Sequence, residues 1–487
     1  MRVLFSLARS AALALALSLT PACAAPPADA DKVGVPDLKE DFDALYNRLK
    51  AAHFDLYARQ PKENYDALYR ELRRAIVKPM TRTEAEIYFQ KFAAYGNVAH
   101  ANIAFPSAAY DTYRAAGGKA FPLFIRYIGE KLFIADDMSG ASPSLAGAQI
   151  ISINGEDAAT IEKRLSAHLS ADNAHLARTM LEFRFGPLMW IEYGEVESFE
   201  VEVEETGGAR RIVSVPALAR DALVKSAAGG FELDWNERRS EIMDGVGYLR
   251  PGPFYNNASD ATDMWDETAF GAFIDEAFDE FIAKEVTAIL IDLRANPGGD
   301  NSFSDLMVAW FADRPFKFAS HFYVKVSEAT IVSNAKRRQP GDEASISARF
   351  AAAYEKAAIG EIIDFDLGES APRDGVRYNG KVFLLIDRHS YSNTVTVAAL
   401  AQDYGFATIL GEETSDLATT YGAMEQFTLP NTGIEVGYPK AHIIRPNGDL
   451  AARGVVPDIA IETPLISQTD VTLKEALRII ANSSGVN

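Results

Sequence analysis

The sequence predicts a multi-domain α+β protein that ends in an α/β sheet domain. Apolar residues recur at helical spacing near the start of the chain, their spacing changes to two in the middle, and strands alternate with helices in the second half. The chain has 487 residues, enough for several domains, and its 48% hydrophobic content is typical of a folded protein with a buried core.

The charge and cysteine content exclude several kinds of partner. The chain has 68 acidic and 48 basic side chains, and a surface this acidic argues against binding to nucleic acid, which needs a basic face. Its single cysteine, Cys23, allows neither a disulfide framework nor a thiolate metal cluster. The acidic residues lack the paired spacing of a metal site, so we expect no metal or other cofactor.

Residues 1–24 have the features of an export signal. The stretch 11–19 is apolar but too short to span a bilayer, and the Ala-Cys-Ala sequence at 22–24 fits a small-x-small cleavage site. We therefore expect an exported, periplasmic protein. In an alternative interpretation Cys23 is a lipid-attachment cysteine that anchors the chain.

A linker over residues 25–35 precedes a predicted helical domain over residues 36–107. We expect its first helix to begin at an Asp37-x-x-Glu40 sequence and its third at a Thr83-x-x-Glu86 capping box. Apolar stripes mark the first two helices: Leu38, Phe42, Leu45 and Leu49, then Tyr65, Leu68, Leu72 and Ile76. The loop after the third helix contains His100.

Residues 119–217 form a predicted β-rich domain. A strand ends in an Asn-Gly turn, and an amphipathic helix over 158–169 and a hairpin of 199–203 with 211–215 follow. This order, together with the Gly-x-x-Ile-x-x-Ile-Asn-Gly sequence at 147–155, resembles a PDZ-like domain, which binds chain ends at a sheet edge. A β insert without a ligand explains the pattern equally well.

Residues 234–466 alternate between strands and helices, which predicts a parallel-containing sheet with its chemistry in loops at the strand ends. Residues 467–487 are expected to form a C-terminal helix or tail. Two strand-to-helix junctions stand out in this domain. The first contains Gly298 and Gly299, whose missing side chains let backbone amides approach a ligand.

The second junction contains Ser390-Tyr391-Ser392-Asn393 and leads from a strand directly into a helix. A serine at the start of a helix lies beside unpaired amide donors and the positive end of the helix dipole. This environment favours the oxyanion that forms during acyl transfer.

The two junctions resemble peptidase family S41, which includes the C-terminal processing, or tail-specific, peptidases and the tricorn core. Further matching motifs occur in the family's order at 247–250, 402–405, 411–414 and 454–459. The resemblance implies a catalytic core of the ClpP/crotonase-like type and a serine peptidase activity. It also implies that Ser392 is the nucleophile and that the amides of Asn393 and of Gly298 or Gly299 form the oxyanion hole.

The resemblance further suggests which base activates the serine. The processing branch uses a lysine after a Gly-Glu-Pro-Thr motif, but Leu417 occupies that place and cannot accept a proton. The tricorn-like branch uses a histidine from the end of its N-terminal helical region, and His100 matches by place. Imidazole is suited to removing a serine proton near neutral pH.

The tricorn-like branch orients its histidine through a serine and a glutamate, and this relay is missing here. Ala99 precedes the histidine, and Ala451 lies in the segment where the glutamate is expected. Asp449 and Glu425 are candidates for a third member of the catalytic set.

Structural roles compete with several of these assignments. Ser392 could be an N-cap residue, and His100 could be a buried structural histidine. We expect His389 to shape the pocket, and Arg294 and Asp292 to stabilise the glycine turn without contacting substrate.

The sequence therefore predicts an exported, metal-independent serine peptidase that cleaves peptides or unfolded proteins, with His100 deprotonating Ser392. One alternative is a degenerate family member that binds peptides or amphiphilic ligands without cleaving them, because Leu417 replaces the lysine and the relay is absent. Another is an esterase that uses the same serine. The sequence does not indicate an oligomeric state.

Overall fold

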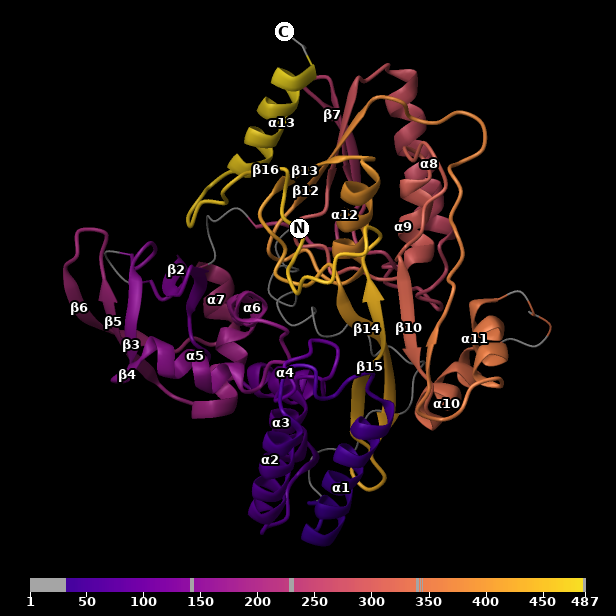
Figure 1. Ribbon diagram of the computed structural model, residues 1–487. Helices are drawn as coiled ribbons and strands as arrows, with labels where there is room; N and C mark the ends of the chain where they lie inside the picture. The colour runs from indigo at the N-terminus through magenta and orange to yellow at the C-terminus, as the bar shows by residue number, and fades with distance from the viewer. Residues whose placement is uncertain are drawn as a thin grey trace. The chain divides into compact units, whose positions relative to one another are not determined.

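The computed structural model describes residues 32–140, 144–226, 232–338, 341, 343 and 345–484. The expected export signal and Cys23 lie outside the described residues. The mixed α/β class is confirmed (Figure 1). The chain forms two compact units: unit 1 comprises Met1–Gly230, Lys325–Glu361 and Ala423–Lys440, and unit 2 comprises Phe231–Val324, Ile362–Gly422 and Ala441–Asn487.

Unit 1 begins with a helical region. Its helices are α1 (Val35–Ala52), α2 (Lys62–Ala75), α3 (Arg82–Ala94) and α4 (Ser107–Ala115). The apolar stripe of α1 is fully buried, and Phe42 packs against the rings of Phe89 and Phe92 on α3. Burial of these aromatic side chains stabilises the packing of the helices against one another.

Two helix starts differ from those expected. Helix α1 begins at Val35 with Pro36 in its first turn and has no side-chain cap, so the expected start at Asp37 is wrong. The capping box of α3 is formed by Thr81 and Glu84, two residues before the expected pair. The earlier threonine is used because Met80 pairs with Val33 in a β-bridge, which leaves Thr81 extended as an N-cap requires.

Unit 1 also contains an antiparallel sheet of order β1-β2-β3-β5-β6, with β4 on β3. The strands are β1 (Leu123–Ile128), β2 (Lys131–Asp137), β3 (Gln149–Ile153), β4 (Glu156–Asp157), β5 (Ser198–Glu204) and β6 (Arg210–Pro216). The expected hairpin is present as β5 and β6. The PDZ-like assignment stays a prediction.

Helices α5 (Ala158–Ser166) and α6 (Ala174–Tyr193) contribute to the core of this sheet, and α7 (Arg220–Ser226) follows β6. Helix α6 was not expected. It contains Pro187 and packs Leu181, Phe185 and Leu188 into the core, so tertiary burial outweighs the poor helix propensity of proline.

The central sheet of unit 2 has the order β16-β13-β12-β9-β8-β7. Its strands are β7 (Arg239–Met243), β8 (Val246–Arg250), β9 (Ala288–Asp292), β12 (Lys381–Ile386), β13 (Thr408–Gly411) and β16 (Ile459–Ala460). All pairs are parallel except β7 with β8. This is the parallel-containing sheet that the alternation predicted.

Helices cover both faces of this sheet (Figure 1). Helices α8 (Thr268–Ala283), α9 (Asn301–Val308) and α12 (Asn393–Tyr404) share a buried cluster with one face, and α13 (Val471–Ser484) packs on the other. The central strands β9 and β12 are therefore buried on both faces, which explains their uninterrupted apolar sequences.

A four-stranded sheet of order β11-β10-β15-β14 was not expected. Its strands are β11 (Ile362–Asp364), β10 (His321–Lys325), β15 (Glu435–Ile444) and β14 (Thr420–Thr428), and β14 and β15 contribute residues to both units. Unit 1 also includes α10 (Glu328–Arg337) and α11 (Ile346–Tyr354). Among the helices described, none combines the length and apolar character needed to span a bilayer.

The acidity of Asp305 on α9 leads to a testable prediction. Burial raises the pKa of this carboxyl to about 6, although Ser370 Oγ donates a hydrogen bond to it at 2.6 Å. The folded state therefore favours the protonated form, and stability decreases as the pH rises from about 4 through 6. We expect Asp305→Asn to raise the free energy of unfolding by about 1–2 kcal/mol at pH 7.5 and to change it little at pH 4.

Urea denaturation at both pH values checks this prediction. Asp313→Asn removes an exposed carboxylate from the same unit and should show no such pH-dependent gain. An equal change at pH 4 and pH 7.5 for Asp305→Asn would contradict the assignment.

Candidate active site

The pairing of two buried strands brings the two junctions together. β9 and β12 are parallel neighbours, with Asp292 opposite Leu385 near their carboxyl ends. Because parallel strands end at the same edge of a sheet, the segments 293–300 and 387–392 leave the sheet side by side. The glycine turn and Ser392 thus meet within unit 2.

Hydrogen bonds join these two segments. Asp387 Oδ1 accepts from the Ala295 amide at 3.0 Å, and the Asn296 carbonyl accepts from the Tyr391 amide at 3.0 Å. The Ser390 hydroxyl, which is fully buried, donates to the Leu293 carbonyl at 2.9 Å. Ser390 is therefore a structural link between the segments.

Ser392 is placed differently from Ser390. It occupies the N-cap position of α12 with φ 55° and ψ −125°, yet its side chain does not cap the helix. Within the described residues its hydroxyl has no hydrogen-bond partner. A non-glycine residue at positive φ between a strand and a helix is strained, and such a turn presents a nucleophilic side chain in other hydrolase folds.

The glycine turn packs directly against the Ser392 segment. A Cβ atom at Gly298, whose φ is +87°, would lie 2.6 Å from the Tyr391 oxygen and 2.8 Å from the Asn393 nitrogen. The Gly298 amide donates to Asn296 Oδ1 at 2.9 Å. The amides of Gly299 and Asn393, by contrast, have no acceptor among the described residues.

Asp416 was missed in the sequence analysis. Its side chain is buried, with Oδ2 accepting from the Ser392 amide at 2.7 Å and Oδ1 accepting from the Leu417 amide at 2.9 Å. Leu417 itself is buried and apolar. The sequence feature that could have pointed to Asp416 is its place directly before position 417, where the processing branch would have its lysine.

His100 lies in unit 1, on a loop that is held on several sides. Asp172 accepts a hydrogen bond from the Ala99 amide at 3.0 Å, and Ser170 Oγ donates to the Ala101 carbonyl at 2.6 Å. Asp172 is paired in turn with Arg59 at 2.9 Å. The backbone on both sides of His100 is therefore fixed by buried polar groups, and the imidazole is itself buried.

The same loop is joined to β15 by a reciprocal pair of backbone hydrogen bonds. The Asn102 amide donates to the Gly437 carbonyl at 3.2 Å, and the Gly437 amide donates to the Asn102 carbonyl at 2.7 Å. A Cβ atom at Gly437 would lie 3.3 Å from the Asn102 oxygen, so the loop approaches this strand closely.

Glu425 and Asp449, the two candidates for a third member of the catalytic set, differ in their burial and partners. Glu425 lies in unit 1, where its carboxylate accepts from Lys440 Nζ and Arg337 Nη1, both at 2.7 Å, and from Ser333. Despite burial, which opposes ionisation, the charges of Arg337 and Lys440 hold the pKa of Glu425 below its ordinary value. Asp449 is exposed in unit 2 and accepts from the Ala451 amide at 2.9 Å.

Arg294 and Asp292 stabilise the strand end from which the glycine turn begins. Arg294 Nη2 lies 2.7 Å from Asp292 Oδ2 and 2.7 Å from Asp470 Oδ2. Although burial opposes ionisation, Arg294 and Arg250 lower the pKa of Asp292 to about 2.

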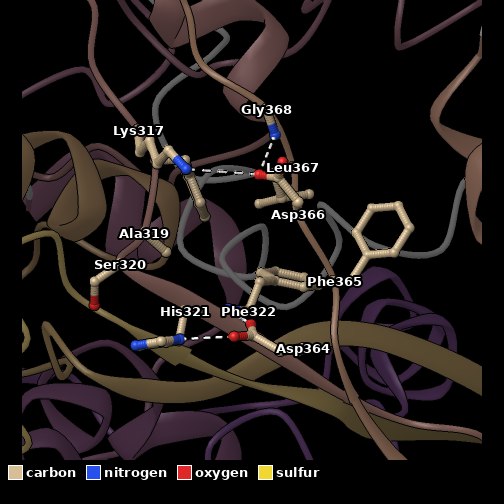
Figure 2. A pocket seen from close by; sticks show the side chains of 11 residues that line it. Lys317, Ala319, Ser320, His321, Phe322, Asp364, Phe365, Asp366, Leu367 and Gly368 are labelled. Atoms are coloured by element: carbon tan, nitrogen blue, oxygen red, sulfur yellow. Dashed lines mark hydrogen bonds and ion pairs between the residues drawn. The ribbon is translucent and has the colours of Figure 1, made fainter.

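A pocket of about 170 Å³ lies elsewhere in unit 2. Figure 2 shows its lining, including the His321 Nδ1 contact to Asp364 at 2.7 Å. None of the predicted site residues lines it. The described residues contain no cluster of three or more His, Cys, Asp or Glu side chains that could hold a metal ion.

The tight packing of Gly298 gives a second prediction. Gly298→Ala forces a Cβ atom into the Ser392 segment and strains the backbone, so we expect a loss of about 2–4 kcal/mol in the free energy of unfolding, measured by urea denaturation. Gly375→Ala is the matched control, because its φ is +81° but no atom lies within 4 Å of its Cβ position. It should lose only about 1 kcal/mol. Equal losses would show that the two segments do not pack as described.

Comparison with known proteins relates part of this chain to a known family. Residues 246–461 match peptidase family S41. The chain resembles a structure of mature CPAF, with a TM-score of 0.62, 15% identity, and coverage of 92% of this chain and 96% of that one. Mature CPAF complexed with lactacystin matches with a TM-score of 0.62, 15% identity, and coverage of 92% and 98%.

A photosystem II D1 C-terminal processing protease matches with a TM-score of 0.44, 16% identity, and coverage of 92% and 98%. No curated protein matches the sequence. Residues 246–461, which include both junctions, are thus similar to peptidase family S41.

Proposed function

We propose that the chain is a peptidase of the serine type, with Ser392 as the nucleophile and His100 as its general base. The observation that carries the proposal is the setting of Ser392 within unit 2. An unpartnered hydroxyl on a strained turn lies at the start of α12, and the glycine turn packs against the same backbone. These are the parts that acyl transfer requires.

In the proposed reaction, His100 takes the proton from Ser392 Oγ as this oxygen bonds to the carbonyl carbon of a peptide. The carbonyl oxygen becomes an oxyanion, and the amides of Asn393 and Gly299 donate hydrogen bonds to it. The C–N bond then breaks, and His100 returns the proton to the leaving amine. Water hydrolyses the acyl-enzyme in the reverse sequence of proton transfers.

The choice of Gly299 over Gly298 rests on hydrogen bonding. The Gly298 amide already donates to Asn296 Oδ1, so using it in an oxyanion hole would break a buried hydrogen bond. The Gly299 amide has no acceptor among the residues described. The helix dipole of α12 adds to the stabilisation of the negative charge.

A competing proposal is a family member that binds peptides without cleaving them. Its support is that Leu417 is buried where the processing branch has its lysine, and that Ala99 and Ala451 stand where the tricorn-like branch has a relay. The two proposals differ in whether Ser392 is activated, which a serine-reactive probe measures directly.

We expect Ser392→Ala to abolish labelling by a fluorophosphonate and to lower kcat/KM for an unstructured polypeptide by about 10³-fold or more. His100→Gln leaves the serine in place, but it should lower both the rate of fluorophosphonate labelling and kcat/KM by at least about 10²-fold. Gel-based labelling and cleavage assays on the purified full chain provide the measurements.

Ser214→Ala and His175→Gln serve as controls, because both residues are exposed in unit 1. They should label and cleave like the wild type. Cleavage by Ser392→Ala at the wild-type rate would remove Ser392 from the mechanism. A wild-type protein that binds polypeptides but is never labelled would instead favour the binding protein.

We further propose that the peptidase is exported, on the basis of the sequence pattern in residues 1–24. Cleavage after Ala24 should release a periplasmic protein that begins at Ala25, as measured by fractionation and intact mass. A lipid-anchored protein would remain with the membrane and start at a modified Cys23. Recovery of the unprocessed chain from the cytoplasm would contradict export.

A further inference from the structure

We infer that Asp416 is a positioning residue for the nucleophile: its buried carboxylate holds the backbone of Ser392 in the conformation that aims the hydroxyl. This inference rests on the proposed role of Ser392 and adds a residue that no family motif quoted above supplies.

The contacts of the carboxylate are specific. Oδ2 accepts from the amide of Ser392 at 2.7 Å, and Oδ1 accepts from the amide of Leu417 at 2.9 Å. The side chain is fully buried, and a buried carboxylate needs hydrogen bonds to remain charged. Each oxygen therefore has a defined donor, which fixes the plane of the carboxylate.

The backbone that Asp416 holds is strained. Ser392 has φ 55° and ψ −125°, a conformation that residues with a side chain rarely adopt. Such a conformation persists only where the surroundings fix it from several sides. The Asn296 carbonyl holds the amide of Tyr391, and Asp416 holds the amide of Ser392 itself.

Asp416 is in turn held by the segments around it. Thr414 Oγ1 donates to the Asp416 carbonyl at 3.0 Å and accepts from the Val455 amide at 2.9 Å. A Cβ atom at Gly454 would lie 1.9 Å from the Thr414 oxygen, so the chain passes too closely for any other residue. The motif at 454–459 therefore supports the nucleophile through Thr414 and Asp416.

Asp416 lies one residue before the position that corresponds to the lysine of the processing branch, and we infer a different role for it. Leu417 occupies the lysine's place and has no group that can accept a proton. Asp416, one residue earlier, directs its carboxylate to the Ser392 amide, and its second oxygen is occupied by the Leu417 amide. Its contact is with the backbone of the proposed nucleophile, so we infer that it acts on the position of Ser392.

The test compares Asp416→Asn with the wild type. An asparagine keeps the size of the side chain but offers only one acceptor oxygen to two amide donors. We expect the rate of fluorophosphonate labelling and kcat to decrease about 10- to 100-fold, with KM within a factor of about three, because a misaligned nucleophile affects the chemical step. Asp416→Ala should lose more than Asp416→Asn.

Asp266→Asn is the matched control. Asp266 is an exposed carboxylate of unit 2 that accepts from the Thr268 amide at 3.0 Å, so its replacement also removes a charge and an amide acceptor. It should retain wild-type labelling and cleavage. Thermal melting of all variants shows whether a lost rate reflects unfolding.

Wild-type protein labelled with ¹⁵N-serine provides a readout that does not depend on a folded Asp416 variant. The Ser392 amide proton, assigned by its absence in Ser392→Ala, should resonate downfield and exchange slowly, as expected for a short hydrogen bond to a carboxylate. A resonance typical of a solvent-exposed amide would overturn the inference. So would a folded Asp416→Asn variant with wild-type labelling.

These outcomes separate the inference from the proposed function. If Ser392→Ala still cleaves, the serine mechanism fails whatever Asp416 does. If Ser392→Ala is inactive and Asp416→Asn behaves like the wild type, only the positioning role fails.

Discussion

The candidate site depends on the parallel pairing of β9 with β12. This register places the ends of two buried strands next to each other, so that the segments following them must run side by side. Shifting β12 by one residue would turn its core side chains to the other face and move Ser392 away from the glycine turn. The apolar sequences of both strands and the helices on both sides of the sheet make such a shift costly.

From this base, the site is built by hydrogen bonds and not by contacts between large side chains. Asp387, Ser390 and Asn296 join the two segments, while Asp416 connects Ser392 to a third. Each of these four buried side chains has a specific partner, and a buried group that lost its partner would carry a large cost. The network therefore fixes one arrangement of the turn.

Much of the central sheet could be predicted from the sequence because β9 and β12 contain uninterrupted apolar runs, 288–291 and 382–386, followed by glycine or serine junctions. Helix α6 and the four-stranded sheet could not. Pro187 argues against a helix locally, and only packing against the strands of unit 1 overrides it. The strands β10 and β15 are distant in sequence, and no local pattern reveals their pairing.

The same distinction applies within the site. Ser392, Asn393 and the two glycines could be proposed as site residues because they lie in motifs where neighbours in sequence are neighbours in space. Asp416 was not, because its contact with Ser392 depends on how the segment after β13 returns to β12. Glu425 was a candidate from its sequence position, but that position gave no sign of its pairing with Arg337 and Lys440.

The close approach of Gly454 to Thr414 has a consequence for natural substitutions at position 454. One added methyl group there would displace Thr414, and the displacement would reach Ser392, the proposed nucleophile, through Asp416. Such a substitution would leave every proposed reacting group intact and still lower the proposed activity.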